Sequence, residues 1–453
     1  LRALAAAVIG RMENLTVTFS AALVIGMIEQ SVLYHTGRTL IVDGVLFFLL
    51  IGALLLQRRG KVTRADDIGA SSWSATREVR PIPRELRILP EVRWGLGLVT
   101  GTIAAALLIL PLSMDVDMVN KLGVGLILSM VCTSLVLLTG WSGQLNLAPL
   151  AFAGFGAAVA GALAARGWDF FLCLIAAGLT GAIVSVIIGL PALRIRGPLL
   201  AVTTLGFALA TGTYFLNTEF FGWVPGSGDR VTRPELFGKF DLESEHAMYY
   251  FLLLLFALVA ASASSIRRSR TGRLLIATRD NARAAQSYGV NPLRARLSAF
   301  ALSGFIAALA GGAYVFHQHG LSDTILRPDS GIRVFAAAVI GGLGTVTGAV
   351  VAGAWITFLD YSPFTRQPLS RLLASGVGML LVLLVIPNGL GGVLYDFRDA
   401  LLRRLARMKN IVVPSLLADV RIDEDDGVSA AIAGIEADEV AGGRLRRRFV
   451  RAQ

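Results

Sequence analysis

The sequence predicts an all-α fold, a polytopic transmembrane helical bundle, and three observations support that prediction. Hydrophobic residues make up 55% of the chain and charged residues only 16%, whereas soluble domains carry about 25% charged residues. A larger soluble core cannot account for this excess, because single cores stop growing at roughly 250–300 residues. Apolar runs long enough to cross a bilayer recur along the chain, and their interiors hold almost no Asp, Glu, Lys or Arg.

These apolar runs each approach the roughly 20 residues that a helix needs to cross a hydrocarbon layer about 30 Å thick. We place them at 94–112, 122–139, 147–165, 170–190, 199–216, 247–265, 297–316, 334–359 and 372–389, after an N-terminal portion with a further run at 40–56. Glycine, with 49 residues, is common enough to let such helices pack closely. Cys132 and Cys173 lie inside the runs and are interpreted as small hydrophobic residues.

The distribution of charge predicts the orientation of the helices. The formal net charge of +11 would suggest nucleic-acid binding in a soluble protein, but here the basic residues lie in short connections between apolar runs. The arginine-rich connections at 57–93 and 266–296 are placed in the cytoplasm, and the acidic connection at 217–246 is placed outside. Membrane lipid is therefore an expected partner and nucleic acid is not.

The segment 334–359 departs from this alternation. If it and 372–389 each crossed the membrane once, the basic tail after residue 394 would lie outside. We therefore expect 334–359 to enter and return as a re-entrant or broken helix, interrupted at Gly341, Gly342 and Gly344. Irregular backbone persists at membrane depth only where protein or a water-filled cavity covers it, so this break is a candidate for a translocation path.

An internal repeat predicts how the chain is divided. The string AAAVIG occurs at 5–10 and again at 336–341, and each copy has an arginine three residues ahead, Arg2 and Arg333. We interpret 1–60 as the C-terminal end of a first transmembrane unit, 61–93 as a basic cytoplasmic linker, 94–394 as a complete second unit, and 395–453 as a charged, disordered cytoplasmic tail. Most of the first unit is then expected to precede Leu1. Two such units would form the pseudo-symmetric pair between which a transporter builds its pathway.

The sequence holds no constellation typical of an enzyme. It lacks the G-x-x-x-x-G-K-[ST] phosphate loop, so ATP binding by that route and a cofactor within the chain are not expected. His317 and His319 stand at an outer helix end without Cys or carboxylates at metal-ligand spacing, and we interpret them as loop histidines rather than metal ligands. Because the spans lack the charged residues of ion-coupled carriers, energy is expected from a partner ATPase on the cytoplasmic face.

A short cytoplasmic helix is predicted between residues 278 and 292. Asp280 or Asn281 can cap its start, Gly289 can end it, and Pro292 prevents it from resuming. Such a helix would lie across the membrane face and offer a dock for an ATPase. An ordinary loop with one helical turn fits these residues equally well.

Four stretches of the sequence resemble one family. They are GWSGQLNLAPLAFAGFGA at 140–157, RIRGPLLAVTTLGF at 194–207, SRTGR at 269–273 with AA at 284–285 and GVN at 289–291, and IGGLG at 340–344 with GA at 348–349. Together, over about residues 94–394, they resemble the permeases of branched-chain amino-acid ABC transporters. The resemblance implies an ABC importer permease type of fold in a prokaryotic plasma membrane, and import of branched-chain amino acids.

The resemblance also implies partners and site residues. The partners would be two cytoplasmic ATP-binding subunits, which bind the ATP, an extracytoplasmic solute-binding protein, and a partner permease half whose end, 1–60, is fused in this chain. The coupling residues would be Ala282, Arg283, Ala284, Ala285 and Gly289. The pathway-lining candidates are Gln144, Asn146, Thr203, Thr204, Gly341, Gly342 and Gly344. The candidates for docking of the binding protein are Gly226, Ser227, Gly228 and Asp229. For the polar lining residues, hydrogen bonding between helices is the alternative, and for the docking residues a plain turn is.

The sequence departs from the family pattern at several positions, and these departures keep other substrates open. Pro149 stands where the family often has His, Asn146 where it has Ser, and Arg283 where coupling loops often have Glu. Permeases for urea and short amides share much of the pattern, so another small polar solute is the alternative substrate. A secondary transporter or channel would be favoured by a coupling-ion site within the spans, and a membrane enzyme by paired catalytic side chains facing one pocket; the sequence indicates neither.

Overall fold

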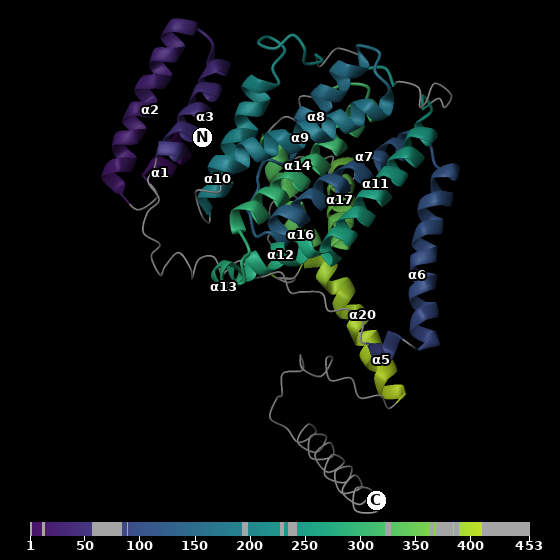
Figure 1. The fold of residues 1–453 in the computed structure, drawn as a ribbon. Helices are drawn as coiled ribbons and strands as arrows, with labels where there is room; N and C mark the ends of the chain where they lie inside the picture. Colours follow the sequence, from purple (N-terminus) through teal and green to yellow (C-terminus); the bar gives the residue numbers. More distant parts are fainter. Residues whose placement is uncertain are drawn as a thin grey trace, which may run out of the picture. The chain divides into compact units, whose positions relative to one another are not determined.

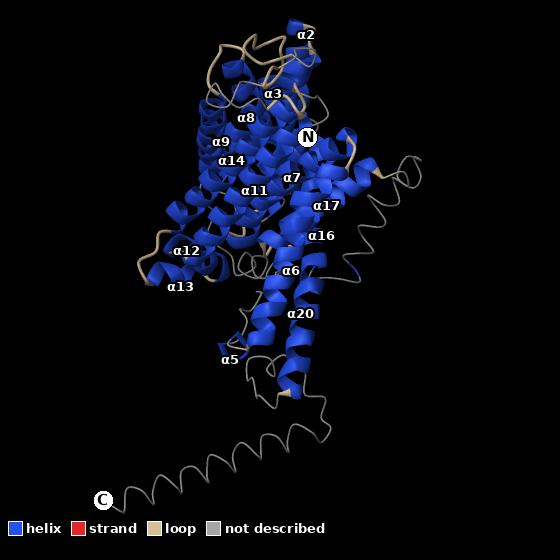
Figure 2. Cartoon of the chain, turned by 90° about the vertical axis from the view of Figure 1, so that its right-hand side faces the viewer, coloured by secondary structure: helices blue, strands red, loops and turns tan. Residues whose placement is uncertain are grey.

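The computed structural model describes residues 2–10, 14–56, 84–87, 89–192, 198–226, 231–233, 242–321, 328–362, 367, 384 and 389–409. The regular structure of these residues is helical, without strands (Figure 1; Figure 2), and the predicted all-α fold is confirmed. Six described helices are long and apolar enough to cross a membrane: Leu15–Thr36, Pro90–Ser113, Val116–Trp141, Phe170–Pro191, Glu245–Arg268 and Pro292–His317. The predicted run at 372–389 lies almost wholly outside the described residues.

The chain divides into two compact units, the larger formed by Leu1–Arg80 with Gly101–Tyr395 and the smaller by Pro81–Thr100 with Asp396–Gln453. In the smaller unit α5 (Arg84–Arg87), the start of α6 (Pro90–Ile109) and the end of α20 (Gly389–Met408) bury Leu86, Val92, Leu402 and Ala406 together. Lys409 and Glu91 form an ion pair at 2.7 Å there. Helix α20 thus continues to residue 408, within the segment predicted as a disordered tail, and residues after 409 lie outside the described part.

The larger unit contains most of the described helices. In chain order they are α1 (Arg2–Ile9), α2 (Leu15–Thr36), α3 (Thr39–Leu56), the short η1 (Leu110–Ser113), α7 (Val116–Leu135), η2 (Val136–Trp141), α8 (Pro149–Ala164), α9 (Phe170–Ala192), α10 (Pro198–Ala210), η3 (Thr211–Phe215), α11 (Glu245–Arg268), α12 (Arg270–Asp280), α13 (Ala282–Ser287), α14 (Pro292–His317), α16 (Pro328–Gly341) and α17 (Val346–Tyr361). Side chains that accept backbone N–H groups begin several of them, as expected for helix caps. These caps are Asn14, Ser244, Ser269, Asn281, Asn291 and Thr345.

Helix α14 lies at the centre of the larger unit, packed against α7, α8 and α9 (Figure 1). Small residues let these backbones touch: a side chain at Gly311 of α14 would overlap the carbonyl of Ala153 on α8. Hydrogen bonds join the same helices, since Ser185 Oγ donates to Phe300 O at 2.7 Å and Ser303 Oγ donates to Ser134 O at 2.9 Å. This close packing through small and hydroxyl residues is typical of helices within a membrane.

Helices α16 and α17 form the interrupted hairpin that the sequence predicts. They have 14 and 16 residues, so each is only about 21–24 Å long, shorter than the hydrocarbon layer. Arg333 near the start of α16 and Asp360 near the end of α17 form an ion pair at 3.2 Å. The two open ends therefore lie side by side, and the chain enters and returns.

The N-terminal hairpin of α1 and α2 matches α16 and α17 residue by residue. The spacing that carries the first AAAVIG onto the second also carries Arg2 onto Arg333 and Glu29 onto Asp360. Arg2 and Glu29 form an ion pair, as Arg333 and Asp360 do. The same spacing carries the helix cap Asn14 onto the helix cap Thr345. The two copies of the repeat therefore share an ion pair and a helix cap as well as a short string of sequence. The domain boundaries inferred from the repeat stay a prediction.

Contacts between helix ends define two opposite faces of the bundle. At one face Asn120 of α7, Glu245 of α11 and His317 of α14 are hydrogen-bonded or within ion-pair distance. At the other face the far ends of α7 and α11 meet the turn between α16 and α17. The helices thus alternate as the charge pattern predicts, and the assignment of the second face to the cytoplasm rests on that pattern.

Candidate functional site

The first element of the candidate site is the break between α7 and α8. Helix α7 ends in the π-helical turn η2, and residues 142–148 then run as irregular backbone before α8 begins. Gly143 adopts a φ of +70°, a conformation that side chains other than glycine rarely accept. Thr139 Oγ1 donates to Gln144 O at 3.0 Å, and Gln144 Nε2 donates to Ser142 O at 3.2 Å. The predicted lining residue Gln144 is therefore buried and held within the break.

Asn146 and Thr204, two predicted lining residues, meet at this break. Thr204 Oγ1 on α10 accepts from Leu147 N at 3.0 Å and donates to Ala201 O at 2.9 Å. Asn146 Oδ1 accepts from Ala148 N at 2.9 Å, directly before α8. Both residues are fully buried, as is Thr203 beside them on α10. The structure thus joins the break to α10 through Thr204. Pathway lining and hydrogen bonding between helices both stay predictions for these residues.

Two buried polar atoms at the break lack protein partners. Among the described residues, Asn146 Nδ2 and Ser142 Oγ are buried without a hydrogen bond. Buried donors are nearly always paired with protein or water, and each unpaired group costs about 1–3 kcal/mol. These atoms therefore give the break a capacity to bind a polar molecule.

The second element is the turn between α16 and α17, where Gly341, Gly342 and Gly344 lie. Gly342 has a φ of +100° and donates from its N–H to Ala338 O at 3.0 Å. A side chain at Gly341 would overlap the carbonyl of Gly348, so the hairpin closes only with glycine there. Gly344 O accepts from Trp141 Nε1 at 3.3 Å, and a side chain at Gly140 would overlap Leu343 O. The two breaks are therefore in direct contact.

The third element is the predicted short helix, which the structure contains as α13. Asn281 is its cap, accepting from Ala284 N at 2.9 Å, and Gly289 follows its end with a φ of +79°. Only Ala285 of the helix is fully buried; Arg283, Ala284 and the following Tyr288 are exposed, Tyr288 at 88%. Helix α13 thus projects from the face that carries both breaks, next to α12 (Figure 1).

Sequence reasoning missed two arginines at this face. Arg267 at the end of α11 and Arg279 near the end of α12 were interpreted only as orientation signals. Arg279 Nη1 donates to Gly140 O at 2.6 Å, and Arg267 Nη1 donates to Gly344 O at 2.8 Å. The acceptors are backbone carbonyls, which no residue type marks, so the sequence carried no signal for these contacts.

At the opposite face a buried polar cluster corrects the interpretation of His317. It is the last residue of α14, fully buried, with Nε2 2.9 Å from Asn120 O, and is not a loop histidine. Arg233 beside it is also buried, donating to Phe316 O, His317 O and Glu245 Oε1. No metal-binding group of His, Cys, Asp or Glu occurs among the described residues.

The predicted docking residues lie mostly outside the described part of the chain. Gly226 is partly buried at the end of the segment 217–226, on the side of the bundle that carries His317, while Ser227, Gly228 and Asp229 are not described. Val231 N donates to His319 O at 2.9 Å, which ties the connection to the end of α14. Docking of a solute-binding protein at this connection stays a prediction.

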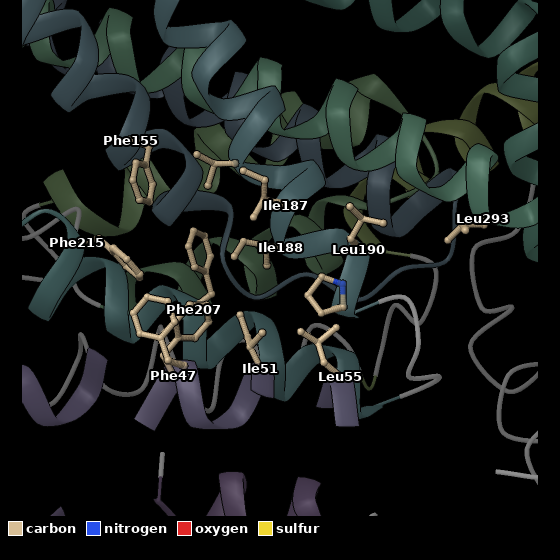
Figure 3. A pocket seen from close by; sticks show the side chains of 13 residues that line it. Phe47, Ile51, Leu55, Phe155, Ile187, Ile188, Leu190, Phe207, Phe215 and Leu293 are labelled. Atoms are coloured by element: carbon tan, nitrogen blue, oxygen red, sulfur yellow. The ribbon is translucent and has the colours of Figure 1, made fainter. Parts of the chain in front are cut away.

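A cavity of about 730 Å³ lies apart from the two breaks, between α3 and the helices α8, α9, α10 and α14 (Figure 3). Its lining is aliphatic and aromatic, with Phe47 and Ile51 of α3 facing Phe207 and Ile188 (Figure 3). Ring centroids of Phe47 and Phe207 lie 5.7 Å apart. None of the predicted lining residues borders this cavity, and its apolar walls suit hydrocarbon rather than a polar solute.

Comparisons with known proteins agree with the motifs. A family model described as branched-chain amino acid transport system / permease component matches residues 118–386. The high-affinity branched-chain amino acid transport system permease LivM of Salmonella typhimurium is 28% identical over 247 residues, covering 49% of this chain and 58% of LivM. LivH of Escherichia coli is 26% identical over 251 residues, covering 51% of this chain and 79% of LivH.

A relative of different specificity is the autoinducer 2 import system permease LsrC of Klebsiella pneumoniae, 28% identical over 188 residues, which cover 40% of this chain and 52% of LsrC. The chain spans less than two thirds of the length of the LivM protein that it matches. No solved structure matches the chain.

Proposed function

Since this chain belongs to the family of branched-chain amino acid transport system permease components, we propose that it forms the membrane path of an ATP-driven importer of branched-chain amino acids. As a member of that family it is a multi-pass protein of the prokaryotic cytoplasmic membrane, and not an enzyme. The observation that carries the proposal is the contact between two interrupted helices at a buried break with unpaired polar atoms. Discontinuous helices form the substrate sites of many membrane transporters, and here both interruptions lie toward the face that carries α13.

The lining of the proposed path combines Gln144, Asn146, Thr203 and Thr204 with the glycines 341, 342 and 344. Asn146 Nδ2 and Ser142 Oγ are the groups available to a solute's polar atoms, since both are buried without a partner among the described residues. The glycines leave room for backbone groups to approach the solute closely. Intramembrane charges are not needed for this role, because the energy would come from ATP hydrolysed by a partner.

The proposed partners dock at opposite faces. Two ATP-binding subunits would contact α13 through Ala282, Arg283, Ala284 and Ala285, with Gly289 ending the helix; its exposed surface supports this role. A solute-binding protein would contact the opposite face at residues 226–229. Residues 1–60 would end a first permease unit fused to this one, which the matched ion pairs and caps of the two hairpins support.

A second candidate function is import of another small polar solute by the same path. Two observations favour this candidate: the similarity to LsrC, an autoinducer 2 import system permease, and the departures from the family pattern at Asn146 and Pro149. The alternative solutes are urea, short amides and other small polar molecules. The fold and the coupling face would be unchanged, and only the groups at the break would select differently.

Uptake by the protein, co-expressed with its ATP-binding subunits and a binding protein and reconstituted in liposomes, tests the proposal. We expect ATP-dependent uptake of labelled leucine, isoleucine and valine, and its loss when exposed Ala284 is changed to Glu. The control is Arg294→Ala, a change of an exposed residue in the first turn of α14. Uptake of urea or acetamide in place of the amino acids would transfer the proposal to the second function, and uptake without ATP would contradict both.

A further inference from the structure

Two arginines connect the segment that carries α13 with the two helix breaks. Arg279 lies three residues before α13, with its side chain 17% exposed. Its Nη1 donates to Gly140 O at 2.6 Å and its Nε donates to Asp280 Oδ1 at 2.9 Å. The side chain passes over Gly143: a Cβ on that glycine would lie 2.7 Å from Arg279 Cγ. The first break is therefore shaped around this arginine.

Arg267 makes the equivalent contact with the second break. It lies in the last turn of α11, and its Nη1 donates to Gly344 O at 2.8 Å. Its guanidinium carbon lies 5.9 Å from the ring centre of Trp141, whose Nε1 donates to the same carbonyl. Arg267, Trp141 and Gly344 thus form one contact that joins α11 to both interrupted helices.

The chemistry of these contacts suits a mechanical link. Gly140 lies in the last turn of η2, where carbonyls lack partners within the helix and carry partial negative charge, so they attract cations. Gly344 lies in the turn between α16 and α17, where its carbonyl accepts from Arg267 and Trp141. A hydrogen bond from a charged donor is roughly twice as strong as a neutral one. Arginine also holds its donors in a rigid fork. A displacement of the helix that bears the arginine therefore acts on the carbonyl that accepts from it.

Helix α12 can transmit a displacement because it is firmly held between α11 and α13. Leu275 and Thr278 are buried, and a side chain at Gly272 would overlap Ile266 O. The passage to α13 is a single residue, Asn281, whose N–H donates to Ala277 O and whose side chain caps α13. A force on α13 therefore reaches Arg279 through a short, hydrogen-bonded connection.

We propose that Arg279 and Arg267 are positioning residues that set the conformation of both breaks according to the position of the α12–α13 segment. The inference rests on the proposed function, because it takes α13 as the dock of an ATP-hydrolysing subunit. It goes beyond that function because it names the contacts through which a movement of α13 would reach the two breaks. The carbonyls of Gly140 and Gly344 are the points that move.

The test measures uptake and ATP hydrolysis together in liposomes that hold the protein with its ATP-binding subunits and a binding protein. We expect Arg279→Gln and Arg267→Gln each to lower solute imported per ATP hydrolysed by about tenfold, the scale of one lost charge-assisted hydrogen bond. Lysine at either position keeps one charged donor and should restore part of the ratio. Arg294→Gln, the same change at an exposed arginine in the first turn of α14, should leave the ratio unchanged.

ATP hydrolysis guards against simple misfolding, because a misfolded complex would lose hydrolysis together with uptake. The lysine variants add a second guard, because they keep a charged donor and should regain part of the ratio that the glutamine variants lose. Equal losses of uptake and hydrolysis in all variants would overturn the inference and leave the import function standing. A wild-type complex that imports no solute would remove the function and the inference together.

Discussion

The hairpins α1–α2 and α16–α17 share their local construction and differ in what surrounds them. Both have an arginine on the first helix paired with a carboxylate on the second, Arg2 with Glu29 and Arg333 with Asp360. Asp360 lies near the end of α17, whereas α2 continues past Glu29 to Thr36. In both, a capping side chain begins the second helix, and a glycine ends the string AAAVIG at the turn. The two hairpins therefore share one form over about thirty residues of sequence.

The two hairpins differ in how their second helices are covered by other helices. Gly353 of α17 lies against Ser129 of α7, and its counterpart on α2, Ala22, is exposed. Thr357 lies against Gly125, whereas in the described part of the chain no atom lies near the place that a side chain at its counterpart Gly26 would take. The matched pairs Ala21 with Ala352 and Ile25 with Ile356 are buried in both. One face of the second helix thus packs within each hairpin, and the other face is covered only on α17.

The uncovered face of α2 is informative because it is apolar and contains small residues. Leu15, Phe19 and Met27 are 83%, 65% and 70% exposed, which in a membrane means contact with lipid or with another helix. Ala22 and Gly26 on the same helix are of the type that lets helices approach closely. The comparison supports the proposal that a first permease unit would cover α2 as α7 covers α17.

The largest expected effect comes from filling the covered face. Gly353→Leu would force a side chain into Ser129 and the backbone of α7, at a cost of about 3 kcal/mol, the upper end for overpacked cores. The matched change Ala22→Leu on α2 should stay within about 0.5 kcal/mol in this chain. Thermal unfolding of the two variants in detergent measures the difference.

The same two variants give a second test in a chain that contains a complete first unit. Where a complete first unit covers α2, Ala22→Leu should lower the unfolding temperature about as much as Gly353→Leu. A neutral Ala22→Leu in that chain would contradict the proposed packing of the first unit and leave α2 facing lipid.

Much of the fold followed from the sequence because a membrane imposes simple demands. Helices must be about twenty apolar residues long, and their ends must alternate between faces, so composition and parity predicted both the runs and the interruption near Gly341. The short helix α13 followed from Asn281 and Gly289, which act within a few residues of themselves. The π-helical turn η2 was not predicted, because it depends on how Gly140 and Trp141 meet the turn of another helix.

The sequence predicted which residues belong to the candidate site, but it did not predict the contacts between them. Asn146 and Thr204 could be named from motifs, yet their meeting through Leu147 N depends on the path of the chain between α8 and α10. His317 was misinterpreted because its partners, Asn120 and Glu245, are distant in sequence. Burial and long-range partners are properties of the packed bundle, which a local pattern does not contain.

A smaller effect is expected from removing the helix caps. Thr345→Ala should cost about 1–2 kcal/mol and Asn14→Ala about 1 kcal/mol, because Thr345 is buried and also accepts from Thr347 Oγ1, whereas Asn14 is exposed. Hydrogen exchange at the amides that they bind, Gly348 and Thr16, measures each loss locally. Thr345→Ser and Asn14→Asp keep an acceptor and should exchange as the wild type does. A larger increase in exchange at Thr16 on Asn14→Ala than at Gly348 on Thr345→Ala would reverse the expected order.

The smallest effect is expected from the two ion pairs, because partly exposed pairs contribute only about 0.2–1 kcal/mol. Arg333 also donates to Ser330 Oγ at 3.3 Å and is 40% exposed, while Arg2 is 65% exposed. A fixed side chain loses less entropy on pairing, so the coupling of Arg333 with Asp360 should exceed that of Arg2 with Glu29. Double-mutant cycles with alanine, analysed by thermal unfolding at low and high salt, measure both couplings.

The exchange variant Arg333→Asp with Asp360→Arg tests whether charge pairing alone is responsible, and it should recover most of the stability lost by either single change. Both couplings should fall at high salt, because ions screen exposed charges. Equal couplings would mean that the hairpin sequence sets the strength of its own closure. A larger coupling at Arg333 would mean that packing against α7 holds the open end in place, and that α2 gains the same support only from a neighbouring unit.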